Sequence, residues 1–198
     1  MFSFHKALNS INCDTSDEFI ERRIGTGAAE TFTEILKEKD VAFDSTLIRR
    51  LVEIKVQAEI DTTSEVTLFP GAKELLKVLQ GKVNLALASM NNRVVINHML
   101  KELKVQKFFP VVITAEEVSQ PKPNPEIFLK TASKSGSIPE KCAVVEDSIF
   151  GVKAAKAARM SCVAVLTGVY SRAELGKASP DLIVSSLMEK KVILKFIL

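Results

Sequence analysis

AVVEDSIFGVKAAKAA, residues 143–158, carries the clearest signal for the fold of this chain. Its opening apolar run leads directly into two adjacent carboxylates, Glu146 and Asp147. A continuous apolar run is typical of a strand buried on both faces of a parallel sheet. The alanine-rich residues 149–158 then predict a helix, which Asp147 or Ser148 could cap. The stretch therefore predicts a strand that turns into a helix, with two like charges at the turn.

The same alternation of strand and helix continues on both sides of this stretch. Apolar runs predict strands at residues 82–89, 109–114, 141–147, 161–168 and 182–186. Apolar residues at helical spacing predict helices at 67–80, 93–103, 124–136 and 149–160. Strands and helices that take turns indicate an α/β fold with a Rossmann-like, doubly wound parallel sheet.

The first 64 residues follow a different pattern. Apolar side chains recur at i, i+3 and i+4 in residues 28–39 and again in residues 45–60, as on one face of a helix. Asp44 or Ser45 could cap the second of these helices. Because no strand pattern interrupts the stretch, we expect a helical domain at 1–64 followed by an α/β core at 65–198.

Composition excludes several classes of protein. The chain has 198 residues, 46% of them hydrophobic, and a net charge of +3, with both signs of charge scattered along the sequence. A dense basic stripe, the usual mark of nucleic-acid binding, is absent from the sequence. No apolar run approaches the roughly 20 residues that a membrane helix needs. We therefore expect neither a nucleic-acid nor a membrane partner.

The cysteines indicate the compartment. Cys13, Cys142 and Cys162 are far apart in the sequence, and there are only two histidines. An odd number of unclustered cysteines fits a reduced cytoplasmic protein better than a disulfide framework or a zinc site. The first ten residues also lack the shape of a signal peptide.

Polar residues follow three of the predicted strands. Ser89 ends the strand 82–89, Lys122 lies in the loop after the strand 109–114, and Glu146 and Asp147 end the strand 141–147. Ligands of such sheets bind beyond the carboxyl ends of the strands. One hydroxyl, one ammonium group and a carboxylate pair are therefore expected to converge on one rim.

Each of these residues also has a purely structural interpretation. Ser89 could cap the next helix, Lys122 could be a solvated loop lysine, and Asp147 could be a helix cap. The carboxylate pair is harder to explain in this way, because adjacent carboxylates at a buried strand end repel each other. Mg²⁺ would balance them through oxygen ligands, and Lys122 could hold a phosphate as a point charge.

Several segments together resemble a known family. PGAKELLKVLQ, LALAS, KPNPEIFL, VVEDSIFGVKAAKAA and VAVLTG are similar to haloacid-dehalogenase-like (HAD) phosphatases of the β-phosphoglucomutase-like branch. The resemblance is close over residues 65–198 and looser over 1–64, which resembles the helical cap of that branch. It implies a HAD-like core that hydrolyses a small phosphorylated metabolite with Mg²⁺ as cofactor.

The resemblance also implies roles for residues at the rim. Ser89, with Met90 and Asn91 beside it, matches the loop that hydrogen-bonds the phosphoryl group. Lys122 matches the lysine that binds the phosphate and neutralises the nucleophile. Asp147 matches a Mg²⁺ ligand, and Glu146 a second ligand or its support. Such a site transfers a phosphoryl group by positioning and charge neutralisation.

One element of the family pattern is missing from the sequence. The family's nucleophile lies in an Asp-x-Asp motif after an apolar strand, ahead of the cap. Asp14 and Asp17 are three residues apart without a preceding strand, and Asp44 lacks a second aspartate. We therefore expect that the chain begins within the cap, and that the strand between those ending in Ser89 and Asp147 is lacking. A shortened gene model, an alternative product or a decayed copy would each explain this.

Two functional hypotheses remain open at this point. The first is a HAD-lineage phosphatase for a small phosphate ester, inactive in this chain because the nucleophile is absent. The second is a non-catalytic phosphate- and Mg²⁺-binding or interaction protein, either a pseudo-enzyme or a truncated product. A dinucleotide-binding enzyme is disfavoured, because no G-x-G-x-x-G follows the first strand. Neither the substrate nor the oligomeric state can be predicted from the sequence.

Overall fold

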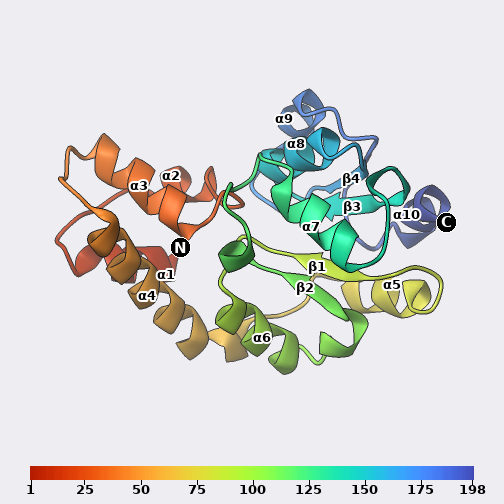
Figure 1. The fold of residues 1–198 in the computed structure, drawn as a ribbon, viewed down its shortest axis with the longest axis horizontal. Coiled ribbons are helices and arrows are strands. Elements are labelled where there is room, and N and C mark those ends of the chain that lie inside the picture. Colours follow the sequence, from red (N-terminus) through yellow and green to blue (C-terminus); the bar gives the residue numbers. More distant parts are fainter.

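The first third of the chain folds as helices alone. The structure is a computed structural model that describes residues 1–198. Figure 1 shows these helices at the opposite side of the molecule from the C-terminus. They are α1 (Phe2–Asn9), α2 (Asp17–Glu21), α3 (Ala28–Glu38) and α4 (Ser45–Asp61), followed by the 3₁₀ turn η1 (Thr63–Glu65).

The predicted apolar faces hold these helices together. Phe32, Ile35 and Leu36 of α3 are fully buried and share one core with Leu51 of α4. Asp44 caps α4, because its carboxylate accepts a hydrogen bond of 2.8 Å from the backbone N–H of Leu47. The two helices predicted at 28–39 and 45–60 are confirmed.

Strands and helices alternate through the rest of the chain. The strands are β1 (Ala86–Ala88), β2 (Val111–Ile113), β3 (Ala143–Glu146), β4 (Ser161–Val165) and β5 (Leu182–Val184). The helices are α5 (Ala72–Leu79), α6 (Arg93–Glu102), α7 (Glu126–Lys134), α8 (Ile149–Ala157), α9 (Arg172–Lys177) and α10 (Lys190–Ile197). Short 3₁₀ turns are η2 (Gln106–Phe108), η3 (Ala115–Glu117) and η4 (Pro139–Lys141). All strand pairs are parallel, which confirms the predicted α/β class.

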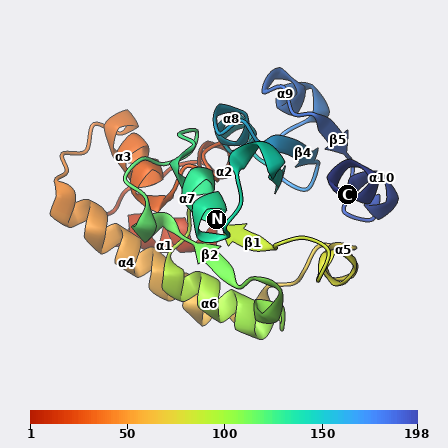
Figure 2. The ribbon, with the colours of Figure 1, turned by 45° about the vertical axis from the view of Figure 1, so that its right-hand side comes forward.

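The strands form two separate sheets. β1 pairs only with β2, and the other sheet has the order β3-β4-β5. Figure 1 shows no strand between β1 and β3, and Figure 2 shows β1 and β2 apart from β4 and β5. These are the strands that end next to Ser89 and at Glu146, so the two strands expected to lack a common neighbour do not pair with each other.

The strand-to-helix turn after β3 has the predicted cap. Ser148 caps α8, because its hydroxyl accepts a hydrogen bond of 2.9 Å from the N–H of Gly151. At the other end of α8, Arg159 adopts a φ of 58°. A left-handed conformation of this kind is usual for a glycine after a helix and costs another residue roughly 1–2 kcal/mol. Arg159 thus ends α8 with the left-handed turn that glycine more often makes.

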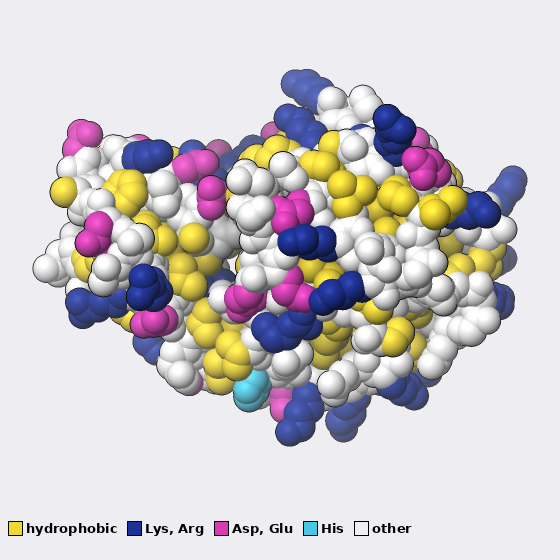
Figure 3. Space-filling view, viewed as in Figure 1, with side chains coloured by type: hydrophobic (Ala, Val, Ile, Leu, Met, Phe, Trp, Pro, Cys, Tyr) yellow, Lys and Arg dark blue, Asp and Glu magenta, His cyan; other side chains and the backbone are white.

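Helices cover both faces of the sheets. One core lies beneath α7 and α8 and includes Ile127 and Val152, and another lies between α5, α10 and the second sheet and includes Leu79 and Ile193. None of the helices is both long and apolar enough to cross a membrane. On the face in Figure 3, charged side chains of both signs are interspersed.

Candidate functional site

The loop after β1 is turned by Ser89. Its backbone N–H donates to the carbonyl of Ile113 at 3.0 Å, which extends the β1–β2 ladder by one residue. Its hydroxyl accepts the N–H of Asn91 at 3.1 Å. Asn92, not Ser89, occupies the cap position of α6, so the interpretation of Ser89 as a helix cap is wrong. The hydrogen bonds of Ser89 instead stabilise the turn of the loop that contains Met90 and Asn91.

Lys122 is a buried residue of the rim and not a solvated loop lysine. Its side chain is 5% exposed, and its Nζ forms an ion pair with Oε1 of Glu146. The same Nζ lies 4.8 Å from the ring centroid of Phe128, within reach of a cation–π interaction. A buried cation held by one carboxylate and one aromatic face is fixed in position, as a phosphate-binding group needs to be.

Glu146 uses both of its carboxylate oxygens within the protein. Oε1 pairs with Lys122, and Oε2 accepts hydrogen bonds from the Ser148 hydroxyl at 3.1 Å and from the Asp147 N–H at 3.2 Å. A Cβ at Gly151 would overlap this carboxyl group, so the glycine leaves it the room it occupies. The contacts of Glu146 are those of a group that supports Lys122 and the turn.

The carboxylate of Asp147 has fewer partners within the protein than the carboxylate of Glu146. Burial raises the pKa of Asp147, and the charge of Glu146 raises it further, while Lys122 and a hydrogen bond from Thr167 act in the opposite direction. The loop after β4 packs against it, since a Cβ at Gly168 would lie 2.7 Å from the Asp147 carbonyl oxygen. A cation beside Asp147 would relieve the cost of keeping this carboxylate charged.

The residues present fit a Mg²⁺ ion with one protein carboxylate. No group of three or more histidine, cysteine or acidic side chains meets here or elsewhere in the structure. Mg²⁺ commonly binds through one or two carboxylates, with phosphate oxygens and water completing its octahedron. Asp147 meets that requirement, whereas Glu146 is already engaged with Lys122. The roles of Asp147 and Glu146 toward a metal stay predictions.

The aspartates near the amino end of the chain are occupied by local structure. Asp14 accepts the N–H of Thr15 at 2.8 Å, and Asp44 caps α4. Asp17 lies 2.6 Å from Nε2 of His5, which is thus in a polar pair on the helical part. None of these contacts joins the group formed by Lys122 and Glu146.

The loop between α2 and α3 lies against the rim, which sequence reasoning missed. A Cβ at Gly25 would lie 2.9 Å from Oγ of Ser148, and one at Gly27 would lie 3.4 Å from Cε of Met90. Both glycines have φ above +100°. The loop therefore touches the residues after both β1 and β3. The glycines were visible in the sequence, but no periodicity indicated what they would approach.

A buried polar network joins α4 to the loop after β1. Lys55 is 4% exposed, and its Nζ lies 2.8 Å from Oε1 of Glu59 and 3.0 Å from Oδ1 of Asn91. Asn91 in turn donates from Nδ2 to Oε2 of Glu59 at 2.9 Å. Burial lowers the pKa of Lys55, and the pairing with Glu59 opposes this. Sequence reasoning missed Lys55 and Glu59, since the contact spans 36 residues to Asn91.

A second junction ties the helical part to α9. Arg22 forms an ion pair with Glu174, and its guanidinium lies 5.6 Å from the ring centroid of Tyr170. The Tyr170 hydroxyl donates to the Arg22 carbonyl at 2.6 Å. The helical part is therefore attached on both sides of the rim, at Asn91 and at Tyr170.

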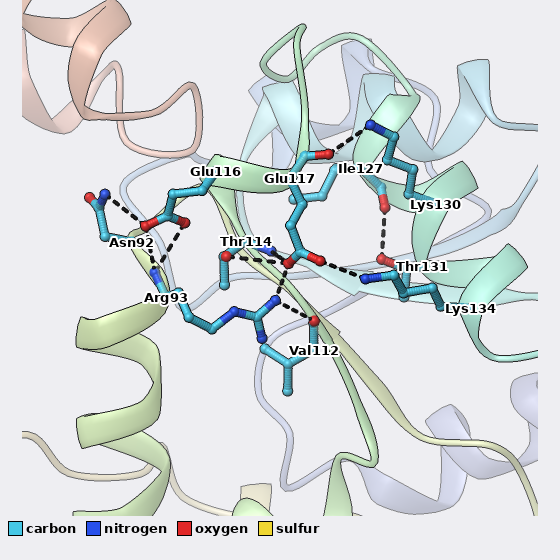
Figure 4. Close-up of polar contacts among 10 residues, drawn as sticks. All are labelled: Asn92, Arg93, Val112, Thr114, Glu116, Glu117, Ile127, Lys130, Thr131 and Lys134. Atoms are coloured by element: carbon cyan, nitrogen blue, oxygen red, sulfur yellow. Dashed lines mark hydrogen bonds and ion pairs between the residues drawn. The ribbon is translucent and has the colours of Figure 1, made fainter.

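The segment that leads to Lys122 is anchored by two glutamates, shown in Figure 4. Glu116 accepts hydrogen bonds from the Arg93 N–H at 2.9 Å and from Nδ2 of Asn92 at 3.0 Å, which gives the first backbone N–H of α6 a partner. Burial acts to raise the pKa of Glu116. The hydrogen bond from the Arg93 N–H acts in the opposite direction, and the pKa lies below its ordinary value.

The neighbouring Glu117 joins three elements, as Figure 4 also shows. Its carboxylate pairs with Arg93 of α6 and, at 2.7 Å, with Lys134 of α7, and it accepts the Thr114 N–H at 3.1 Å. The hydrogen bond from Lys134 lowers the pKa of Glu117. The Lys130 ammonium donates to the Glu117 carbonyl at 2.7 Å. These bonds fix the end of β2 and thus the start of the Lys122 loop.

Comparisons with known proteins place this geometry in a family. A profile described as haloacid dehalogenase-like hydrolase matches residues 1–165. Among curated proteins, SUPPRESSOR OF QUENCHING 1 of Arabidopsis thaliana is 34% identical over 173 residues, covering 85% of this chain and 16% of that protein. A phosphoglycolate phosphatase of Nitrosococcus oceani is 31% identical over 135 residues, covering 68% of this chain and 60% of that one.

The solved structures give the same result for the fold. A crystal structure of a hydrolase from Pseudomonas syringae matches with a TM-score of 0.90 and 26% identity, covering 99% of this chain and 90% of that one. A structure described as a β-phosphoglucomutase from Clostridium difficile matches with a TM-score of 0.82 and 24% identity, covering 98% and 90%, and shows the fold alone. The chain spans less than two thirds of the length of the curated relatives named above.

Proposed function

This chain belongs to the haloacid dehalogenase-like hydrolase family, and we propose that its rim binds a small phosphate ester together with Mg²⁺. The observation that carries the proposal is the buried pair of Lys122 and Glu146 next to Asp147. Lys122 is buried at this rim, where Glu146 balances its charge and fixes its position. Asp147, whose carboxylate has fewer partners within the protein, lies beside this pair. This is the arrangement that an anion and a divalent cation would occupy together.

Each residue of the rim has a distinct task in the proposed site. Lys122 attracts the phosphate by charge, and Glu146 holds its ammonium group in place. The loop of Ser89, Met90 and Asn91 offers its polar groups to the phosphoryl oxygens. Asp147 supplies the carboxylate for Mg²⁺, which when bound neutralises charge on the phosphate.

The proposed ligand is a small phosphorylated metabolite. The relative from Nitrosococcus oceani is named for phosphoglycolate, and another, from Thermotoga maritima, is named for phosphorylated carbohydrates. We further propose that residues 1–64 act as the cap and residues 65–198 as the core. We also propose that the protein is cytoplasmic. The contacts of Gly25 with Ser148 and of Lys55 with Asn91 support a cap that lies over the rim.

Turnover requires a nucleophile, and the 198 residues contain no Asp-x-Asp motif after an apolar strand. The aspartates that came nearest to the motif, Asp14, Asp17 and Asp44, are held in other contacts. We therefore propose that this chain, by itself, binds the phosphate ester without hydrolysing it. This agrees with the hypothesis of a non-catalytic phosphate- and Mg²⁺-binding or interaction protein, whereas measurable turnover by this chain would leave only the phosphatase hypothesis.

The experiment that tests the proposal combines binding and turnover. Calorimetric titration of inorganic phosphate into the chain should show binding that Mg²⁺ strengthens, and a generic phosphate ester incubated with the same preparation should stay intact. Binding without turnover supports the proposal. Measurable hydrolysis that Asp147→Ala abolishes would support the phosphatase and overturn the claim of inactivity, and no binding in either condition would overturn both.

A further inference from the structure

A pocket outside the rim is lined by residues of α6, β2 and α7. It has a volume of about 490 Å³, within the roughly 300–1,000 Å³ of pockets that hold small molecules. None of the rim residues Ser89, Lys122, Glu146 and Asp147 lines it. We call it the β2 pocket, and its walls include Arg93, Asn97, Gln106, residues 109–112 and Lys134.

The backbone of Val112 faces the edge of β2 that has no partner strand. β2 pairs with β1 along one edge only, where the Ile113 carbonyl accepts the N–H of Ser89 at 3.0 Å. Successive residues of a strand direct their backbone groups to opposite edges, so the N–H and C=O of Val112 lie at the other edge. The Val112 carbonyl accepts a hydrogen bond from Nη2 of Arg93 at 2.8 Å. The N–H of Val112 remains as a donor at the pocket.

Two cations of the pocket keep unused hydrogen-bond donors. Figure 4 shows Arg93 reaching from α6 and Lys134 from α7 toward Glu117. Arg93 uses only Nη2 for its bonds to Glu117 and Val112, so the N–H groups of its Nε and Nη1 have no partner within the protein. Lys134 makes one ion pair, at 2.7 Å, although an ammonium group has three N–H donors. Because Glu117 balances only one of the two charges, one positive charge is in surplus.

The remaining walls of the pocket are polar on one side and apolar on the other. Asn97 and Gln106 are exposed, and their side-chain amides are not used in hydrogen bonds within the protein. Leu100 and Phe109 belong, with Val112, to the hydrophobic cluster beneath α6. No acidic side chain lines the pocket. A matching ligand therefore has acceptor oxygens at one end and an apolar body at the other.

From these features we propose that the β2 pocket binds a small organic monoanion, with its carboxylate at Val112, Arg93 and Lys134 and its apolar body on Leu100 and Phe109. The two oxygens of a carboxylate accept several hydrogen bonds at once, so they can serve the Val112 N–H and both cations. Its single negative charge balances the surplus that Glu117 leaves. An inorganic anion would leave the apolar floor exposed to water, and a neutral molecule would leave the charge unbalanced. The proposal does not depend on phosphate binding at the rim.

Binding is tested by nuclear magnetic resonance titration of the full 198-residue chain with phenylacetate. The probe should bind with one-to-one stoichiometry. Acetate has the charge without the apolar body, and phenylacetamide has the shape without the charge, so each should bind at least about tenfold more weakly. No saturable binding of phenylacetate, or equal binding of phenylacetamide, would overturn the proposal, and equal binding of acetate would overturn the role of the apolar floor.

The backbone amide signals in the same spectra locate the bound probe. Those of Val112 and Gln106 should move with the concentration of phenylacetate, because both residues line the pocket. Those of Lys122 and Asp147 should stay in place, because neither lines it. If the largest changes occurred at Lys122 and Asp147, the carboxylate would occupy the rim instead, and the proposed site would be wrong.

A matched pair of variants tests the role of charge. Gln106→Glu keeps the shape of an exposed side chain and adds a negative charge to the pocket wall, so phenylacetate affinity should fall by at least about threefold. Gln80→Glu makes the same change at an exposed residue that ends α5 outside the pocket, and it should bind as the parent does. Circular dichroism checks that both chains are folded. A folded Gln106→Glu chain with unchanged affinity, or an equal loss in Gln80→Glu, contradicts the proposal.

Discussion

Gly151 and Glu146 face each other so closely that the carboxyl group of Glu146 fills the space where a Cβ of residue 151 would stand. The same carboxylate holds the buried ammonium group of Lys122. One glycine in the first turns of α8 therefore decides where the charge of the rim is placed.

Replacing this glycine should be costly although it lies in a helix. Alanine is favoured over glycine inside a helix by about 1 kcal/mol, but at residue 151 it would displace the Glu146 carboxyl. We expect Gly151→Ala to lower the free energy of unfolding by about 1–3 kcal/mol, as overpacking does, and to weaken phosphate binding. Urea denaturation measures the first effect and calorimetry the second.

Gly176 in α9 provides the control for this prediction. A Cβ there would meet its nearest neighbour, Cδ1 of Ile183, at 3.9 Å, which is ordinary contact. Gly176→Ala should therefore raise stability by about 0.5–1 kcal/mol. If both substitutions were stabilising, the close approach of Gly151 to Glu146 would be disproved.

The ion pair of Lys122 and Glu146 should matter far more than a surface pair. Their side chains are 5% and 12% exposed, so Lys122→Met would leave a buried carboxylate unpaired and should cost about 3–5 kcal/mol of stability. The pair of Lys130 and Glu126 is more open, with Lys130 47% exposed, and Lys130→Met should cost no more than about 1 kcal/mol. Equal losses in denaturant unfolding would contradict the buried position of Lys122.

The junction between Arg22 and Glu174 should give an acid-sensitive contribution to stability. Hydrogen bonds from Ser171 and from Arg22 lower the pKa of Glu174 to about 2, from its ordinary value of 4.5. Because the folded pKa is depressed, the stabilisation is complete above about pH 4.5 and is lost as the pH falls toward 2. Glu174→Gln should therefore be less stable than the parent near neutral pH and approach it near pH 2.

Thermal melting over this pH range measures the effect. Glu53→Gln is the control, since Glu53 is on the exposed side of α4 and forms no ion pair. It should keep the parent's pH dependence, and a Glu174→Gln chain that also kept it would rule out a depressed pKa at Glu174.

The three cysteines should differ in reactivity. Burial raises the pKa of all three thiols, that of Cys162 to about 12 with Glu146 and Asp181 adding to the effect, so exposure is what separates them, and Cys13 and Cys162 are buried. Cys142 is partly exposed, so it should be the one thiol that reacts quickly with Ellman's reagent in the folded chain. Cys142→Ser should remove the fast phase and Cys13→Ser should keep it, whereas two fast thiols would show that the core around Cys162 opens readily.

Local sequence patterns predicted the secondary structure well, because each element here carries its own signal. The apolar run before Glu146 became β3, and Ser148 caps α8. The pattern of α3 predicted its buried face, with Phe32 fully covered. Strand ends followed from the apolar runs, so the loops of Ser89 and Lys122 were expected at the same rim.

The rest of the rim depends on contacts between distant parts of the chain. Helical spacing places Lys55 on the buried face of α4, four residues after Leu51 and three before Ala58. Its partner Asn91 lies 36 residues away, so the pattern does not show what the lysine would contact. Arg22 meets Glu174 across 152 residues. Gly25 and Gly27 indicate a loop in the sequence. Only the folded chain shows that they approach Ser148 and Met90. No periodicity encodes such pairs.

The proposed Mg²⁺ site depends on the carboxylate of Asp147, which calorimetric titration of inorganic phosphate with and without Mg²⁺ can test. We expect Mg²⁺ to strengthen phosphate binding to the parent chain and to Asp61→Asn, a control whose side chain is 50% exposed on the helical part. Asp147→Asn keeps the shape of the side chain and removes its charge, so the effect of Mg²⁺ should vanish. If Mg²⁺ strengthens phosphate binding equally in the Asp147→Asn chain, the proposed site is wrong.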